Sequence, residues 1–338
     1  MVCEEEVREA VVGSGLFARD RPVVAMLSGG RDSTCLLDVA VALLGAGALS
    51  ALHVNYGLRR QADAEERHCA ALCERLGVEL EVVRAAGGGQ AVGNLQAWAR
   101  ELRYAEAGRM ARERDALIAT GHTASDQVET ILYRLAASPG RRALLGMVAS
   151  EGRLIRPLLG VSREQTAAYC RARGLSWCED ASNDDERYAR ARVRNGLVPA
   201  LRAVHPAAEA NVLRTASLLR EETELLDGLV SDELAGRRSI ALTRLRELPA
   251  ALARLVVVRL AEDAVGTYVP QAGDRVDEIL ALARRGGRAE LHVGAQAGAV
   301  IHDGVLEMVR LEPRGSAAHP PTNPPAQPTP ASEPPGED

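Results

Sequence analysis

The stretch PVVAMLSGGRDSTCLLDVAVALL, residues 22–44, decides the fold of this 338-residue sequence. Its first part, Pro22–Leu27, is a short apolar run typical of a buried strand, and apolar residues then recur at helical spacing from Ser33 to Leu44. Between these segments lies the string Ser28-Gly29-Gly30-Arg31-Asp32-Ser33. A turn rich in serine and glycine between a strand and a helix presents backbone N–H groups to an anion, in front of the positive end of the helix dipole. The stretch therefore predicts a strand, a phosphate-binding loop and a helix.

The residue types of this loop suit a nucleotide with a metal ion. Its glycines let the backbone approach a phosphate closely, the serine hydroxyls donate further hydrogen bonds, and Asp32 can hold a Mg²⁺ ion that the phosphates also bind. A structural turn with Asp32 or Ser33 as the helix N-cap is the alternative. The complete six-residue string in this context favours the phosphate site.

The alternation of strand and helix continues through the first 160 residues. Such alternation predicts an α/β fold, with a Rossmann-like parallel sheet that is covered by helices on both faces. Ligands of such sheets bind beyond the carboxyl ends of the strands. The further strands are expected at 51–55, 79–83, 116–120 and 154–158, and the further helices at 62–76, 94–114, 124–137 and 163–173.

The second half of the chain predicts a linker and a small second domain. A long amphipathic helix is expected over 207–230. Two helices at 249–263 and 275–284 and short β-like segments near 291–293 and 299–302 are expected after it. From Glu312 onward, 9 of 27 residues are proline and no apolar period is present, which is typical of a disordered tail. The predicted parts are a catalytic domain at 1–205, a helical linker at 206–236, a small domain at 237–311 and the tail at 312–338.

The composition excludes several chemistries. Lysine and arginine total 41, but the sequence contains no lysine, which rules out a lysine nucleophile, a pyridoxal Schiff base and a Walker A loop. The six cysteines form no C-x-x-C pair, so neither a zinc ribbon nor a redox dithiol is indicated. We find no signal peptide and no membrane-spanning run, and we expect a cytoplasmic protein with reduced thiols. The net charge is −5, yet residues 141–202 carry a local charge of +5 that would attract a polyanion.

A second constellation, GHTASDQVET at residues 121–130, follows the expected strand at 116–120. If a helix begins near Ala124, Asp126 and Glu129 lie on one face of its first turn, with His122 just before it. Two carboxylates and an imidazole at the end of a strand could bind a metal ion or an ammonium substrate. Helix capping by Thr123 or Ser125 explains the same residues equally well. The residues alone leave these interpretations open.

Several stretches of the sequence resemble a known family. The string Ser28–Ser33 resembles the pyrophosphate loop (PP-loop) of N-type ATP pyrophosphatases, whose fold is also described as adenine nucleotide alpha hydrolase-like. Further stretches are similar to the tRNA(Ile)-lysidine synthetases, in order and over about residues 20–230. They are HVNYGLR at 53–59, ARELRY at 99–104, the block at 121–130, LGM at 145–147, RPLL at 156–159 and EDASN at 179–183, which continues through Arg190, Arg192 and Arg194 to Pro199.

The resemblance implies an ATP-dependent ligase that modifies tRNA. ATP would adenylate the wobble cytidine in the CAU anticodon of an isoleucine tRNA, and free L-lysine would then displace AMP to form lysidine. The cofactors implied are ATP and Mg²⁺, and the small domain would recognise tRNA. No membrane is implied, and a homodimer is compatible with the family.

The resemblance also assigns roles to residues. ATP would be held by Ser28, Gly29, Gly30, Arg31, Asp32 and Ser33, with Asp32 also the metal ligand. Asp126 and Glu129 would bind the lysine ammonium, and together with Asp32, His122 and Arg192 they form the expected catalytic set. The tRNA contacts would come from Arg100, Arg103, Arg190 and Arg194.

The sequence departs from the family pattern at Thr123, at Ser125 and over 137–140, and we expect it to resemble the short form of the family. Two other functions are alternative interpretations of the sequence. A PP-loop tRNA thiolase would use the same loop but usually needs cysteine pairs, and a non-catalytic nucleotide-binding module would leave the acidic pair without a purpose.

Overall fold

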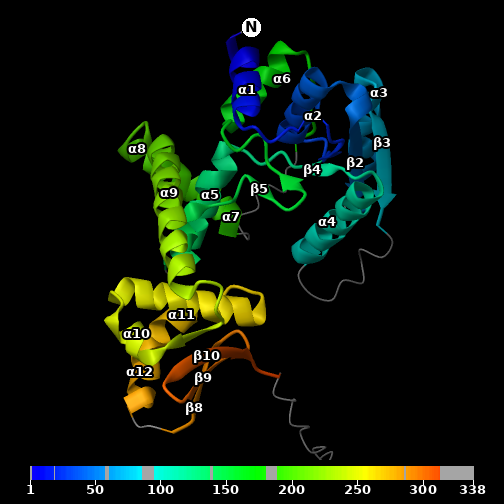
Figure 1. The fold of residues 1–338 in the computed structure, drawn as a ribbon. Coiled ribbons are helices and arrows are strands. Elements are labelled where there is room, and N and C mark those ends of the chain that lie inside the picture. The colour runs from blue at the N-terminus through cyan, green and yellow to red at the C-terminus, as the bar shows by residue number, and fades with distance from the viewer. Residues whose placement is uncertain are drawn as a thin grey trace, which may run out of the picture. The chain divides into compact units, whose positions relative to one another are not determined.

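The computed structural model describes residues 2–18, 20–57, 61–85, 95–137, 140–179, 189–284 and 287–312. The chain divides into two compact units, Met1–Thr223 and Glu224–Asp338 (Figure 1). The division falls inside one long helix, α9 (Ala208–Leu234), and so lies later than the expected domain end at 205. Most of the proline-rich segment, residues 313–338, and the segment 180–188 lie outside the described residues.

The first unit is built on a six-stranded sheet in the order β3-β2-β1-β4-β6-β5. Five strands are parallel, and β5 pairs antiparallel with β6 at the edge. The predicted parallel α/β sheet is confirmed, whereas the two-residue edge strand β5 was not predicted. The strands are β1 (Val23–Met26), β2 (Leu49–Asn55), β3 (Glu79–Arg84), β4 (Leu117–Ala119), β5 (Ser150–Glu151) and β6 (Leu154–Ile155).

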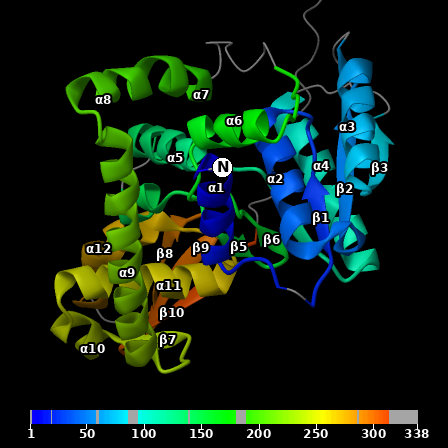
Figure 2. The same ribbon diagram turned by 90° about the horizontal axis from the view of Figure 1, so that it is seen from above.

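Helices cover both faces of this sheet, because alternate side chains of each strand point to opposite faces. Val23 and Ala25 of β1 pack in a core with α1, α2, α3 and α6, while Val24 and Met26 pack against α4 on the other face. The strands and these helices can be followed in Figures 1 and 2. Every expected helix of this region is present. The helices are α1 (Val2–Gly13), α2 (Arg31–Leu44), η1 (Ala46–Ala48), α3 (Ala62–Leu76), α4 (Leu95–Glu113), α5 (Ala124–Ala137), η2 (Arg141–Leu145) and α6 (Arg163–Ala172).

A smaller core joins α5 to the helices that follow the sheet. Val128 and Leu132 of α5 pack with Val193 and Val198, and with part-buried residues at the start of α9. This packing explains why the first half of α9 belongs to the first unit. The connecting elements are α7 (Ala189–Arg192), the π-helical turn η4 (Val193–Leu197) and α8 (Val198–Val204).

The second unit contains a four-stranded antiparallel sheet in the order β7-β10-β9-β8, with its own apolar core. The helices at 249–263 and 275–284 and the strands near 291–293 and 299–302 agree with the sequence analysis, which did not predict β7, α10 or β10. The elements are β7 (Ser239–Ala241), α10 (Leu242–Glu247), α11 (Ala250–Val265), η5 (Pro270–Arg275), α12 (Val276–Arg284), β8 (Ala289–Gly294), β9 (Ala297–His302) and β10 (Val305–Arg310).

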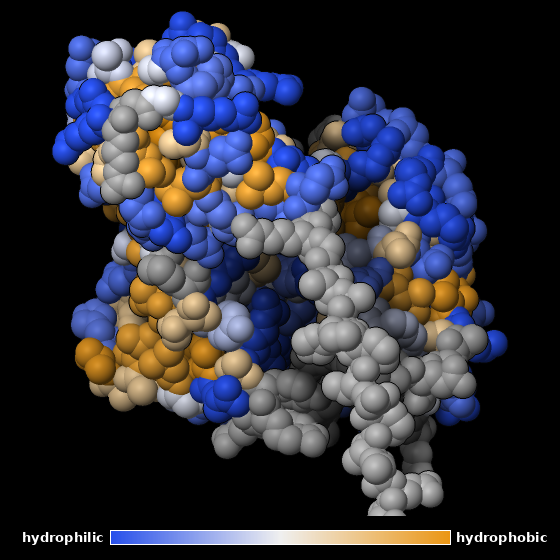
Figure 3. Space-filling view, turned by 90° about the horizontal axis from the view of Figure 1, so that it is seen from below, coloured by the Kyte–Doolittle hydropathy of each residue, from blue (hydrophilic) through white to orange (hydrophobic). Residues whose placement is uncertain are grey.

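The surface mixes charged and apolar side chains, as Figure 3 shows for one face. Exposed apolar residues include Val204 and Leu225, and arginine–carboxylate pairs such as Arg109 with Glu113 recur. Exposed pairs of this kind contribute little to stability. Among the described helices, none is long and apolar enough to cross a membrane. The five cysteines whose side chains are described are free thiols.

Candidate active site

A cavity of about 690 Å³ opens at the carboxyl ends of β1, β2 and β4, where the sequence analysis placed the ligand. It brings together most of the expected site residues, although they lie far apart in the sequence. Gly29, Arg100, Glu129 and Arg192 do not line it. The expected residues that line it are Ser28, Gly30, Arg31, Asp32, Ser33, Arg103, His122, Asp126, Arg190 and Arg194.

The loop between β1 and α2 is held in shape by its own serines. The Ser28 and Ser33 hydroxyls lie 3.1 Å apart, the Ser33 hydroxyl donates to the Gly30 carbonyl at 2.9 Å, and the Gly30 N–H donates to the Ser28 hydroxyl. The N-cap of α2 is Gly30, which provides no side-chain cap. The alternative in which Asp32 or Ser33 caps the helix is therefore wrong, and the helix N-terminus is available to an anion.

Two glycines allow the backbone around this loop to pack closely. Gly29 has φ of +80°, and a Cβ there would lie 3.2 Å from the Cys69 sulfur. A Cβ on Gly121, in the turn after β4, would lie 3.0 Å from backbone atoms of Asp32 and Ser33. The turn that carries His122 is thus pressed against the loop, which places the two sequence motifs side by side.

Asp32 is oriented by α6, an element to which the sequence analysis assigned no site residue. The buried Thr166 hydroxyl lies 2.5 Å from Asp32 Oδ1, and Arg31 Nε donates to the same oxygen at 3.0 Å. The other oxygen, Oδ2, accepts no hydrogen bond within the described part of the chain, and Arg163 Nε lies 3.8 Å from it. The start of α6 follows the strand at 154–155, so the rule that ligands bind at the carboxyl ends of strands could have pointed to Arg163 and Thr166.

The residues at Asp32 suit a magnesium ion. One carboxylate, beside two serine hydroxyls and an anion-binding loop, matches the preference of Mg²⁺ for few protein ligands completed by phosphate oxygens and water. No cluster of three or more histidine, cysteine or acidic ligands occurs among the described residues, so an all-protein metal cage is not indicated there.

Asp126 and Glu129 lie on the first turns of α5, as predicted, and two arginines neutralise them. Arg163 donates to Asp126 Oδ1 at 2.5 Å and to Glu129 Oε1 at 2.6 Å. Arg194 binds both oxygens of Glu129, at 2.8 and 3.0 Å. Glu129 is buried, and burial of a carboxylate is tolerated only when its charge is paired in this way.

The departures from the family pattern have structural roles in this acidic pair. The Thr123 N–H and hydroxyl both donate to Asp126 Oδ2 at 2.9 Å, and the Ser125 hydroxyl accepts the Arg163 N–H. Burial alone would raise the pKa of Asp126, but Arg163 and the Thr123 donors outweigh it and hold the pKa below its usual value. Asp126 is therefore ionised at neutral pH.

His122 is a neutral imidazole in this site. Burial lowers its pKa to about 4, and the nearby arginines oppose the raising effect of Asp126. Its Nδ1 lies 2.8 Å from the Thr120 hydroxyl. A neutral ring can accept a proton, but a pKa this low makes it a weak base at neutral pH.

The expected tRNA-binding arginines fall in different surroundings. The Arg100 guanidinium lies over the Tyr104 ring, 4.7 Å from its centroid, at the surface. Arg103 and Tyr104 line the cavity, and the Arg103 Nε and Tyr104 hydroxyl have no hydrogen-bond partner among the described residues. Arg190 is exposed at the cavity edge, and Arg192 is exposed outside it.

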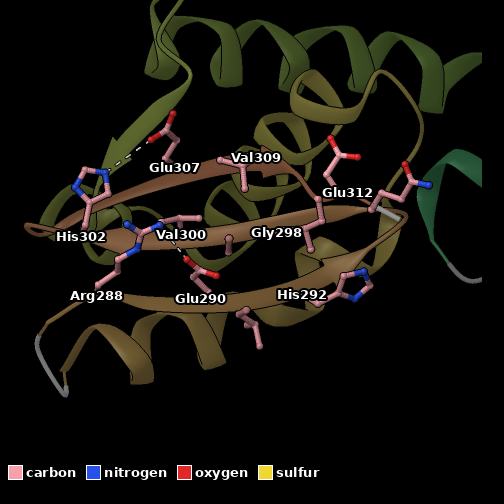
Figure 4. A pocket seen from close by; sticks show the side chains of 13 residues that line it. Arg288, Glu290, His292, Gly298, Val300, His302, Glu307, Val309 and Glu312 are labelled. Atoms are coloured by element: carbon pink, nitrogen blue, oxygen red, sulfur yellow. Dashed lines mark hydrogen bonds and ion pairs between the residues drawn. The ribbon is translucent and has the colours of Figure 1, made fainter. Parts of the chain in front are cut away.

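A larger cavity, of about 1000 Å³, lies in the second unit on one face of the sheet of β8, β9 and β10 (Figure 4). Its floor is apolar, with Val300 and Val309, and ionisable side chains such as Glu290, His292 and His302 surround it. It contains no residue of either sequence motif. The chemistry of the lining residues, rather than volume, therefore identifies the smaller cavity as the candidate active site.

Comparison with known proteins agrees with the fold and the loop. A family model for the PP-loop domain matches residues 4–201, more than half of the chain. The chain belongs to the PP-loop family of ATP-binding domains.

The curated relatives share a name that is more specific than the family. The tRNA(Ile)-lysidine synthase of Pseudomonas fluorescens (strain Pf0-1) is 42% identical over 214 residues, which cover 61% of this chain and 48% of that protein. The enzyme of the same name from Pseudomonas aeruginosa is 40% identical over 250 residues, which cover 67% of this chain and 55% of that protein. The chain thus spans about half the length of the curated relatives it matches.

Among solved structures, the U34-tRNA thiolase NcsA from Methanococcus maripaludis has a similar fold. The TM-score is 0.56 at 17% identity, over 65% of this chain and 80% of that chain. This likeness is one of fold.

Proposed function

We propose that the chain is an ATP-dependent ligase of the tRNA(Ile)-lysidine synthase type. ATP adenylates the wobble cytidine of an isoleucine tRNA with a CAU anticodon, and the ε-amine of free L-lysine then displaces AMP. The observation that carries the proposal is one cavity lined by both the phosphate loop and Asp126, whose neighbour Glu129 is buried and shares the Arg163 guanidinium with it. The identity of about 40% to curated synthases over the same residues supports it.

The residues of the cavity have distinct tasks in this reaction. The loop N–H groups and serine hydroxyls bind the nucleotide phosphates. Asp32, with Oδ1 fixed by Thr166, would hold Mg²⁺ through Oδ2, and the ion would neutralise charge on the pyrophosphate that leaves. Arg190 and Arg194 line the cavity and supply positive charge to the nucleotide or to tRNA phosphates.

The acidic pair selects the amine in this scheme. Lysine ends in an alkylammonium, and its site must offer carboxylates to the charged form before the amine loses a proton and attacks. Asp126 provides an ionised carboxylate in the cavity, and Glu129 lies one turn further along α5. His122 and Arg192 remain proposed members of the catalytic set; the lowered pKa values of His122 and Asp126 make each of them a weak base at neutral pH.

A Glu129→Gln variant tests this assignment. We expect the KM for lysine to rise steeply while formation of adenylated tRNA without lysine persists, because adenylation precedes attack by the amine. A filter assay for radiolabelled AMP bound to tRNA separates the two steps. Loss of adenylation with unchanged lysine binding would instead place Glu129 in the nucleotide site.

The two alternatives have weaker support. A thiolase is compatible with the fold neighbour, but a likeness of fold does not carry an activity, and the sequence has no C-x-x-C pair. A non-catalytic module would keep two carboxylates and two arginines in and beside the cavity at a cost in desolvation, with no function to offset it. A cytoplasmic location, tRNA recognition by the second unit and a homodimer remain part of the proposal.

The direct experiment is incorporation of radiolabelled lysine into a CAU-anticodon isoleucine tRNA in the presence of ATP and Mg²⁺. We expect incorporation with this tRNA and none with the methionine tRNA that shares the anticodon. Incorporation of sulfur in place of lysine would favour the thiolase, and ATP binding without any modified tRNA would favour the non-catalytic module.

A further inference from the structure

The acidic pair that would bind the lysine ammonium is already engaged by donors of the protein. Asp126 Oδ2 accepts two hydrogen bonds from Thr123, and Asp126 Oδ1 accepts one from Arg163. Glu129 Oε1 accepts from Arg163 and Arg194, and Oε2 accepts from Arg194. Each acid thus accepts three hydrogen bonds out of the roughly four that a carboxylate can accept, and an incoming ammonium meets two guanidinium groups here unless one of them moves away.

The charges of this cluster also balance without a substrate. Asp32, Asp126 and Glu129 supply three negative charges, and Arg31, Arg163 and Arg194 pair with them. An additional cation in such a part-buried cluster is unfavourable unless another cation leaves or an anion arrives. Since ATP is a polyanion, its arrival at the loop would change this balance.

Arg163 is better placed to move than Arg194. Both arginines line the cavity, but Arg163 already reaches towards the phosphate loop, with its Nε 3.8 Å from Asp32 Oδ2. It contacts each acid of the pair through a single nitrogen, whereas Arg194 holds Glu129 with two. The two-bonded geometry of Arg194 is the more strongly held one.

We propose that Arg163 is an exchangeable counterion that makes amine binding depend on bound nucleotide. This inference rests on the proposed function. When the triphosphate occupies the loop, the Arg163 guanidinium pairs with its oxygens and leaves Asp126 and Glu129, which then accept the lysine ammonium. Without nucleotide, Arg163 fills the amine site and excludes lysine. This exchange keeps lysine out of its site until ATP is bound and the wobble cytidine can be activated.

The inference requires reciprocal coupling between two ligands. If nucleotide tightens lysine binding, lysine must tighten nucleotide binding by the same factor. Couplings of this kind usually lie between about 5-fold and about 150-fold. We expect wild-type protein to bind lysine at least about tenfold more tightly when the nucleotide site is filled.

The test is titration calorimetry of L-lysine into the full chain, with and without Mg²⁺ and α,β-methylene-ATP, an analogue that cannot be cleaved to AMP. In Arg163→Gln, lysine should bind without nucleotide, and the analogue should change its Kd by less than about twofold. Arg171→Gln removes an exposed charge from the same helix and should keep the wild-type coupling. Arg163→Lys retains one charge but cannot bridge both acids, so its coupling should fall between the two.

The outcomes separate this inference from the function it rests on. Equal lysine affinity with and without the analogue in wild type, or wild-type coupling in Arg163→Gln, would overturn the role of Arg163 and leave the ligase intact. If Arg163→Gln does not fold, the coupling is measured in Arg163→Lys instead. Wild-type coupling in that variant would also overturn the role of Arg163. Absence of lysine binding by wild type, even with the analogue and CAU-anticodon tRNA present, would contradict the proposed function itself.

Discussion

Thr166→Val removes the one hydroxyl that orients Asp32 while keeping the shape of the side chain. Thr166 is fully buried, and its hydroxyl lies 2.5 Å from Asp32 Oδ1 and 3.0 Å from the Arg163 carbonyl. Its single proton goes to the nearer, charged acceptor. A hydrogen bond to a charged group contributes about 1.5–3 kcal/mol, so we expect a loss of about 2 kcal/mol. For a unit of this size that corresponds to a fall in Tm of about 4–8 °C.

The same change should weaken the metal site, because a carboxylate that keeps the Arg31 contact but loses the Thr166 hydroxyl is less firmly oriented. We expect the concentration of Mg²⁺ needed for half-maximal adenylation to rise by about tenfold, in the range usual for loss of such a supporting hydrogen bond. Differential scanning fluorimetry measures the Tm, and AMP release at varied Mg²⁺ measures the second effect.

The matched control is Thr34→Val. The Thr34 hydroxyl is equally buried but has no hydrogen-bond partner among the described residues, so its removal should cost nothing. Thr166→Ser keeps the hydroxyl and should restore the Mg²⁺ dependence. If Thr166→Val matches the Thr34→Val control in both Tm and Mg²⁺ dependence, α6 does not orient Asp32 and the reasoning fails.

Three further changes have distinct expected outcomes. Asp32→Asn should abolish AMP release in a product assay, because it weakens metal and phosphate binding together; near-normal turnover would be contrary. Arg190→Gln should reduce the salt slope of tRNA binding by about one in a filter-binding series, while Arg171→Gln leaves it unchanged; equal slopes would remove Arg190 from the tRNA contacts. His122 has a pKa lowered to about 4, so the unfolded chain binds the extra proton between about pH 4 and about pH 6.5, and stability falls as the pH falls through that range. Urea denaturation should show a weaker pH dependence in His122→Asn, and an identical one would refute the shift.

The elements of the first unit could be predicted because their signals are local. The run at 22–27 and the glycine-rich turn after it specify β1 and the start of α2 within a dozen residues. The edge strands β5, in the first unit, and β7, in the second, have only two and three residues, which are too few for an alternating apolar pattern to be recognised. Their pairing depends on neighbours that the sequence does not place beside them.

The site was predicted only as far as its motifs extend. Asp126 and Glu129 were identified as a pair because they lie one turn apart on α5. Their partner Arg163 is more than thirty residues away, and Thr166 is 134 residues from Asp32. Such contacts arise only when the sheet brings α2, α5 and α6 to one edge. The sequence therefore identified the two acids as a pair, but not that arginines of the protein already bind them.

In the proposed function, one cavity couples cleavage of ATP to AMP with attachment of lysine to tRNA. The most direct measurement is a single reaction of the purified chain with ATP, L-lysine and CAU-anticodon isoleucine tRNA, in which nucleotide products and tRNA fragments are analysed together by mass spectrometry. This coupling predicts equal amounts of AMP, pyrophosphate and an anticodon fragment heavier by one lysine less one water. ADP and phosphate as products, or AMP formed in the full reaction while the anticodon fragment keeps its mass, would contradict it.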